Sequence, residues 1–285
     1  AQPSVVSVGD SFFVVFVDHR TPHGSVYGKY VSSVGIPEEG PGFLVNDREK
    51  AYFPYLFGSK GTLLLTVEYA WRYGSDHYAI FYSPPPKEIN YFYFLTKYYG
   101  RKIAAFNGER FAVLTSEGIT LCDKEGDRLS PIGFDQYGEY PSIRWIGEKW
   151  VLTWMQYNDD RKVVEVYFSF VSDSGLIEPP GIVHVADADN YFPYTFTEAF
   201  DDHLVIFWRE SKKLYKREID LNGNFLDPGP QLVVQRDDLL YPLASAKGIN
   251  TILVVWKEKM SPEIWGILLD QNGNPKKGPF KISQS

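Results

Sequence analysis

Residues 242–273, PLASAKGINTILVVWKEKMSPEIWGILLDQNG, contain the pattern that decides the fold. A proline opens an apolar strand, a second strand ends in Trp256, and a third strand runs from Trp265 to a turn at Gly273. The interval of eight residues between this aromatic and this glycine recurs at Tyr27 and Gly35, Tyr167 and Gly175, and Tyr215 and Gly223. Tyr78 and Pro86, and Gly118 and Gly126, keep the interval with altered residues. This repetition predicts a repeat architecture.

The repeats predict an all-β fold: a six-bladed β-propeller with four antiparallel strands per blade, because a fourth outer strand follows each turn. We expect a single domain over residues 1-285, with blades at about 1-50, 51-100, 101-138, 139-190, 191-239 and 240-285. The stretch from Gly273 through both chain ends to Pro3 is as long as that from Gly126 to Pro141. We therefore expect the chain ends to meet and close the ring without strand exchange between blades.

Composition narrows the range of partners. The formal net charge is −7, with no cluster of basic residues, so we expect no nucleic-acid partner. The apolar runs are far shorter than the roughly 20 residues that span a bilayer, so no membrane span is predicted. The one cysteine, Cys122, excludes an internal disulfide and leaves the compartment open. We expect a monomer that needs no cofactor.

Residues 13–20, FVVFVDHR, and residues 25–35, SVYGKYVSSVG, carry a family resemblance. They are similar to the VVWxDxRxxxxDIYGQRVSxDG repeat of secreted and cell-surface propellers from archaea and bacteria. The resemblance covers all six blades in outline, although Phe16, Thr66 and Leu114 replace the family's Trp in the first three. It implies an extracellular or cell-surface module that binds a ligand or acts as a scaffold. The function we expect is non-catalytic binding or scaffolding.

An enzymatic alternative comes from residues 2–13, QPSVVSVGDSFF, which resemble the first strand of the five-bladed arabinanases and xylosidases. In that family an Asp before the proline is the general base, whereas this chain has Gln2. An amide cannot take up a proton from water at neutral pH, so we expect no catalytic residues. The alternative function is a propeller glycoside hydrolase or lyase that acts on a polysaccharide.

The candidate ligand site lies where second strands turn into third strands and where each blade begins. We expect a long polar loop at residues 69–76, another at residues 18–25, and a tight turn at residues 116–118, which together would leave a notch beside the third blade. Aromatic faces beside polar groups suit sugar rings or peptides, so the expected ligand is a carbohydrate or a protein or peptide segment. The expected binding residues are His23, Tyr52, Tyr55, Trp71, Arg72 and His77.

A carboxylate recurs two residues after the Trp position, at Asp18, Glu68, Glu210 and Glu258. A catalytic pair across the channel is one reading, but recurrence favours a structural role, which we predict to be capping of loop backbone amides. Residues 187–190, DADN, could offer oxygens to calcium but lack the glycine and distal glutamate of a calcium loop, so we expect no metal. Trp154, Trp208 and Trp256 are predicted core residues.

Overall fold

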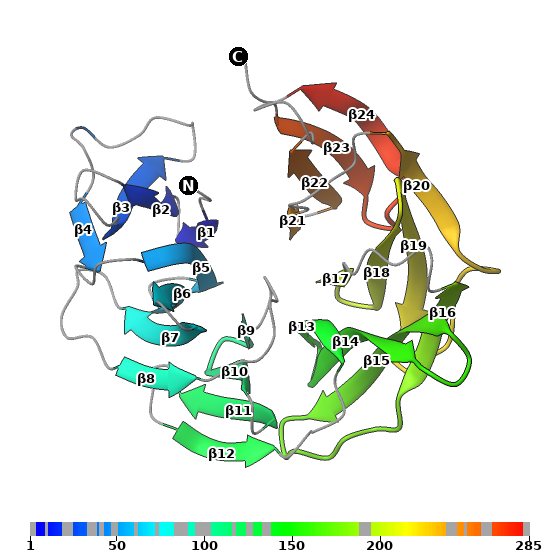
Figure 1. The fold of residues 1–285 in the computed structure, drawn as a ribbon, viewed down its shortest axis with the longest axis horizontal. Helices are drawn as coiled ribbons and strands as arrows, with labels where there is room; N and C mark the ends of the chain where they lie inside the picture. Colours follow the sequence, from blue (N-terminus) through cyan, green and yellow to red (C-terminus); the bar gives the residue numbers. More distant parts are fainter. Residues whose placement is uncertain are drawn as a thin grey trace. The chain divides into compact units, whose positions relative to one another are not determined.

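The computed structural model describes residues 4–8, 11–18, 25–32, 39, 43–46, 51–59, 62–71, 74–82, 91–94, 104–115, 118–123, 128–132, 138–187, 195–237, 244–247, 250–257 and 264–281 (Figure 1). Across these ranges the regular secondary structure is β-strand. The described strands form six four-stranded antiparallel sheets, and each sheet uses four strands that are consecutive in the chain. The predicted all-β class with four-stranded antiparallel sheets is therefore confirmed.

The chain divides into two compact units, and the first comprises Ala1–Lys97 and Ala104–Asp135. Its three described sheets are, in chain order, β1 (Ser4–Val8), β2 (Ser11–Asp18), β3 (Ser25–Ser32) and β4 (Phe43–Asn46); β5 (Ala51–Ser59), β6 (Thr62–Trp71), β7 (Gly74–Tyr82) and β8 (Tyr91–Phe94); and β9 (Ala104–Phe106), β10 (Arg110–Thr115), β11 (Gly118–Asp123) and β12 (Arg128–Ile132). Strand β5 contacts strands of both other sheets, so the β5–β8 sheet lies between them.

The second unit comprises Tyr98–Ile103 and Gln136–Ser285. Its three described sheets are β13 (Glu139–Ile146), β14 (Lys149–Asn158), β15 (Val163–Ser172) and β16 (Gly181–Asp187); β17 (Thr195–Ala199), β18 (His203–Glu210), β19 (Lys213–Asp220) and β20 (Gln231–Gln235); and β21 (Ala244–Lys247), β22 (Thr251–Lys257), β23 (Ile264–Asp270) and β24 (Pro275–Lys281). Strand β17 contacts both β13 and β21, so the β17–β20 sheet lies between the other two.

Strand β18 shows why its sequence, HLVIFWRE, is apolar almost throughout. Side chains alternate between the two faces of a strand, and this strand is covered on both. Leu204, Ile206 and Trp208 join the core shared with the β13–β16 sheet. Val205 and Phe207 join the core shared with the β21–β24 sheet. The predicted core tryptophans Trp154, Trp208 and Trp256 are all buried, as expected.

The third strand of each of the last two sheets ends in the same turn pattern, Asp-x-Asn-Gly-Asn. We call these segments the 220–224 turn and the 270–274 turn. In each turn the first Asp Oδ1 accepts hydrogen bonds from the backbone N–H groups of both asparagines. Gly223 and Gly273 have φ of 83° and 78°, the left-handed region that glycine adopts without a side-chain clash. This explains the glycine that ends these two repeats.

No described helix is both long and apolar enough to cross a bilayer.

Candidate functional site

The expected loop at residues 69–76 is instead a paired hairpin. Tyr69 pairs with Asp76 and Trp71 pairs with Gly74, so two residues alone connect β6 to β7. The prediction of a long loop was wrong because polar and glycine residues at a hairpin tip resemble a loop in sequence, while the backbone groups still pair. The tight connection predicted for the third repeat is supported, since Thr115 pairs with Gly118.

Backbone register brings two of the expected site residues together. Tyr52 on β5 pairs with Glu68 on β6, and Glu68 pairs with His77 on β7, so the three lie in one row across the sheet. Tyr55 pairs with Thr66, further from the hairpin tip. Trp71 ends β6 at the tip itself. His23 and Arg72 lie outside the described residues.

The hairpins between second and third strands differ in length. Beyond the repeat's Trp position, β6 and β7 continue for five residue pairs, whereas β10 and β11 continue for one. Strands β14 and β15 continue for four pairs beyond Trp154 and Tyr167, which the sequence analysis did not foresee. Residues 155–158 and 164–166 alternate apolar and polar side chains on either side of the polar residues 159–162, and this pattern is the signal that could have shown the extension.

The β14–β15 hairpin carries a buried carboxylate, Glu165, that is fully engaged. The Tyr167 hydroxyl donates to Glu165 Oε2 at 2.6 Å, and Arg161 Nη1 donates to Oε1 at 2.7 Å. Asn158 Nδ2 donates to Oε2 at 3.4 Å. Burial raises the pKa of Tyr167 to about 12, and the bond to the Glu165 carboxylate adds to this shift. Glu165 therefore ties the two strands and the hairpin tip together.

The recurring carboxylate after the Trp position has a structural partner, but a different one from that predicted. Glu210 Oε1 accepts the indole N–H of Trp208 at 2.9 Å and lies 2.6 Å from His184 Nε2 on the neighbouring sheet. Burial alone would raise the pKa of Glu210, but the bonds from His184 and Trp208 outweigh burial and hold that pKa below its ordinary value. At Glu210, the prediction of backbone-amide capping is thus wrong, because the carboxylate binds the indole N–H of Trp208 and the His184 ring instead of a backbone amide.

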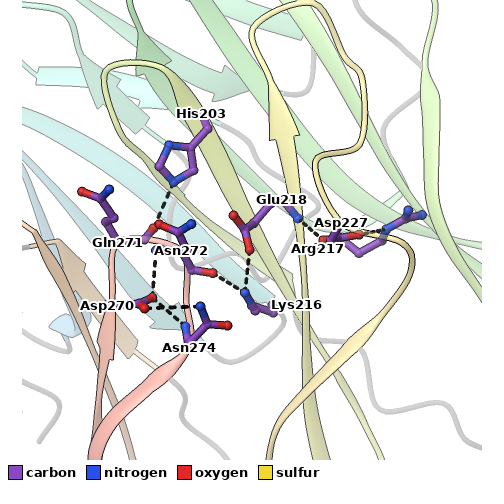
Figure 2. Close-up of polar contacts among 9 residues, drawn as sticks. All are labelled: His203, Lys216, Arg217, Glu218, Asp227, Asp270, Gln271, Asn272 and Asn274. Carbon is purple, nitrogen blue, oxygen red and sulfur yellow. Dashed lines mark hydrogen bonds and ion pairs between the residues drawn. The ribbon is translucent and has the colours of Figure 1, made fainter.

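A polar network joins the β17–β20 sheet to the 270–274 turn of the last sheet (Figure 2). The buried Lys216 ammonium donates to the Asn272 carbonyl oxygen and, at 2.7 Å, to Glu218 Oε1. His203 Nε2 lies 3.1 Å from the Gln271 carbonyl oxygen, and its Nδ1 lies 2.6 Å from Asp202 Oδ1. Two carbonyl groups of one turn are thus held by two side chains of the preceding sheet.

Repeat positions could have revealed this network. Counted from Tyr215, Lys216 and Glu218 occupy the positions that Phe168 and Phe170 occupy after Tyr167. This Lys–Glu pair departs from the pattern, because the same two positions are aromatic in the preceding repeat. The pattern alone does not name the acceptors, because the Asn272 carbonyl oxygen lies on another sheet.

A second polar chain crosses all three sheets of this unit along their first strands. Glu198 on β17 lies 3.7 Å from Arg144 Nε on β13, and it accepts a hydrogen bond from the Ser245 hydroxyl on β21. Thr153 and Thr197 hydroxyls meet at 3.0 Å between the first two sheets. Burial lowers the pKa of Arg144, and the Glu198 charge opposes that shift. The bonds of Glu198 therefore join the first strands of the three sheets, and Thr153 adds a contact from the second strand β14.

The described residues contain no group of three or more His, Cys, Asp or Glu side chains that could hold a metal ion. Asp187 ends β16, while the other three residues of the 187–190 segment lie outside the described ranges.

No protein-family model and no curated protein sequence matches this chain. Among solved structures, it is similar to the β-propeller domain of the trilobed protease from Pyrococcus furiosus, with a TM-score of 0.56 at 10% identity, covering 99% of this chain and 84% of that one. The chain has the β-propeller fold. A prolyl endopeptidase structure matches with a TM-score of 0.52 at 12% identity, and the match covers 99% of this chain but 42% of that one. An α-L-arabinofuranosidase from Podospora anserina has a TM-score of 0.46 at 13% identity, covering 80% and 67%.

As parts of a propeller fold, the described four-stranded sheets are blades. The polar groups set out above therefore join strands within a blade, as at Glu165, or neighbouring blades, as at Glu198, Glu210 and Lys216. Similarity at these identities shows the fold alone.

Proposed function

We propose that this chain is a non-catalytic binding or scaffold propeller that acts outside the cell or at the cell surface, with a carbohydrate or a peptide as ligand. The observation that supports this most directly is the use of the buried carboxylates in the second unit. Glu165, Glu198 and Glu218 are each paired with a cation, and Glu165 and Glu198 also accept a hydrogen bond from a hydroxyl group. A general acid or base must exchange its proton with a substrate, and these groups are committed to the fold instead.

The proposed ligand surface is the projecting end of the β5–β8 blade. Among the described pairings of second with third strands, this hairpin extends furthest past the Trp position. The row of Tyr52, Glu68 and His77 lies next to its tip. Trp71 at the tip offers an aromatic ring for stacking, and Arg72 offers hydrogen bonds to hydroxyl or carbonyl oxygens. His23 and Tyr55 complete the proposed residue set.

The architecture we propose is a closed ring of six blades. Each described blade is built from four consecutive strands, with no strand shared between the two chain ends. The Pyrococcus furiosus propeller domain, which resembles this chain in fold, has an open velcro topology. We infer that the ring closes without strand exchange between blades. Deleting residues 280–285 should lower the melting temperature or cause aggregation, and an equally stable monomer would place the closure elsewhere.

Binding can be tested on the purified chain with a glycan array and a peptide library, together with a panel of polysaccharide substrates for turnover. For any ligand found, Trp71→Ala and Arg72→Ala should each weaken binding by at least about tenfold, as loss of an interface anchor does. Glu258→Ala on another blade is the matched control and should leave the affinity unchanged. Full affinity in both variants would contradict the placement, and turnover would support the hydrolase or lyase alternative.

A further inference from the structure

Three asparagines in this chain precede a glycine: Asn107, Asn222 and Asn272. An asparagine in this position can lose its side-chain amide, because the following glycine has no side chain to keep its nitrogen away from the asparagine Cγ. The attack requires rotation about two bonds, one in the asparagine side chain and one that turns the asparagine carbonyl group. A contact that holds the side chain or the carbonyl group therefore slows the reaction.

The side chain of Asn107 is held by its own turn. Its Oδ1 accepts hydrogen bonds from the backbone N–H groups of Glu109, at 2.8 Å, and Arg110, at 2.7 Å. Attack on Asn107 Cγ would require both bonds to break. This local pairing therefore protects the first of the three asparagines.

The carbonyl group of Asn272 is held by the preceding blade (Figure 2). The buried Lys216 ammonium donates a hydrogen bond to the Asn272 carbonyl oxygen. His203 Nε2 lies 3.1 Å from the carbonyl oxygen of Gln271, one residue earlier. Gly273, whose nitrogen would attack, is buried, and a Cβ placed there would lie 2.8 Å from Lys216 Cδ. This turn therefore cannot rotate without losing contacts to another blade.

No comparable contact holds Asn222. The residue is exposed, and within the described part of the chain no hydrogen bond reaches its carbonyl oxygen. The nearest atoms to a Cβ placed at Gly223 belong to the rings of Phe168 and Phe170, at 3.5 to 3.7 Å. Phe168 stands at the repeat position of Lys216, and a phenyl ring has no N–H group to donate.

The two Asp-x-Asn-Gly-Asn turns are otherwise matched. The Gly223 N–H donates to the Asp220 carbonyl oxygen at 3.1 Å, and the Gly273 N–H donates to that of Asp270 at 3.0 Å. These bonds slow attack by both glycine nitrogens alike and do not distinguish the turns. The hold on the asparagine carbonyl group is what differs.

We propose that Asn222 is a site of spontaneous deamidation, and that Lys216 protects the equivalent Asn272 from the same reaction. The Gly223 nitrogen loses its proton to hydroxide and bonds to Asn222 Cγ, while the Cγ–Nδ2 bond breaks and the amide leaves as ammonia after it takes a proton from water. Water then opens the succinimide ring at either carbonyl carbon and leaves an aspartate or an isoaspartate. Overall, one amide and one water become one carboxylate and one ammonium ion. This inference is independent of the proposed ligand site.

The product alters a turn that contacts the neighbouring blade. Isoaspartate adds one main-chain carbon between the backbone N–H groups of residues 222 and 224, which Asp220 Oδ1 binds together. The new carboxylate also places a second negative charge beside Asp220. Deamidation therefore weakens the 220–224 turn as the protein ages.

Mass spectrometry of peptides from the full chain, aged in a mildly alkaline buffer, tests the proposal. It follows the exchange of amide for carboxyl at each asparagine, and a protein isoaspartate methyltransferase with S-adenosylmethionine identifies isoaspartate. Asn222 should react at least about tenfold faster than Asn272, since a bond from a cation must break first at Asn272. Asn107 should also react more slowly than Asn222. In concentrated guanidinium chloride, which unfolds the turns, all three should react at similar rates.

Three results would overturn the proposal. One is equal rates at Asn222 and Asn272 in the folded chain. Another is an Asn222 that stays intact in the folded chain while the unfolded chain reacts fully. The third is an unfolded chain in which the two rates already differ as much as in the folded one, because the sequence and not the fold would then set them.

Lys216→Met tests the protecting group. It should speed the loss of the Asn272 amide by about tenfold and leave the rate at Asn222 unchanged, since it removes a charged donor from one turn only. Lys212→Met is the matched control, because Lys212 pairs with Asp237 at 2.9 Å on the exposed surface. An unchanged rate at Asn272 in folded Lys216→Met would show that Lys216 does not protect it.

The double variant Lys216→Phe with Glu218→Phe gives the same test without an unpaired buried carboxylate. It copies into this joint the aromatic pair of Phe168 and Phe170, and it decides the question if Lys216→Met does not fold. Asn272 should again react faster than in the wild type. A wild-type rate at Asn272 in the folded double variant would overturn the role of Lys216.

Discussion

Replacement of Gly273 by alanine should lower the stability of the fold in two ways, through backbone strain and through a steric clash. With φ at 78°, any side chain there meets the left-handed penalty of about 1–2 kcal/mol. A new Cβ would also lie 2.8 Å from Lys216 Cδ and 2.9 Å from Val205 Cγ1. The lysine side chain can move, but Val205 is buried on a central strand and cannot. Overpacking of this kind costs about 1–3 kcal/mol more.

Gly223→Ala is the matched comparison, because the 220–224 turn has the same Asp-x-Asn-Gly-Asn pattern and the same hydrogen bonds. Its φ is 83°, but the nearest atom to a new Cβ would be Phe168 Cε2 at 3.5 Å, an ordinary contact distance. Gly223→Ala should therefore cost about 1–2 kcal/mol, from backbone strain alone, and Gly273→Ala about 2–5 kcal/mol.

Urea denaturation followed by tryptophan fluorescence measures both variants, with the free energy of unfolding taken from midpoints at a common m-value. Equal losses in the two variants, or a larger loss in Gly223→Ala, would refute the argument that the joint at Gly273 is sterically full. A smaller loss for Gly273→Ala when Val205→Ala is added would show that Val205 is the obstacle.

The remaining predictions concern the core, one titration and the fold class. Trp208→Ala removes a fully buried ring that donates to Glu210, so it should lower the free energy of unfolding by about 3–5 kcal/mol. Trp71→Ala, at a hairpin tip, should lower it little. Equal losses of unfolding free energy in denaturation would contradict this prediction. Tyr167 should ionise near pH 12 in an ultraviolet titration, and because an unfolded tyrosine releases its proton near pH 10, its contribution to stability is present below pH 10 and is lost between about pH 10 and 12. Tyr167→Phe should remove that part of the pH dependence. Far-ultraviolet circular dichroism should give a helical fraction below about a tenth, and a larger fraction would be incompatible with six four-stranded sheets.

The sequence by itself determined the repeat unit and its strands. The eight-residue interval that ends at Gly175, Gly223 and Gly273 marks a turn that requires φ above zero, and this requirement is local. Strand alternation and the buried tryptophans are likewise local, because side-chain direction in a strand depends only on position in the strand. These signals sufficed for the all-β class and the four-stranded sheets.

Tertiary structure alone decided which polar groups meet. The 69–76 segment forms a hairpin because its backbone groups pair across β6 and β7, and polar side chains do not reveal that pairing. Glu210 binds His184, and Lys216 binds the Asn272 carbonyl oxygen, across separations of 26 and 56 residues along the chain. Such partners are set by how one blade packs on the next, and no periodicity within a single repeat contains that information. The physical reason is that the free energy of a buried charge depends on the atoms that replace water around it, and packing between blades supplies those atoms.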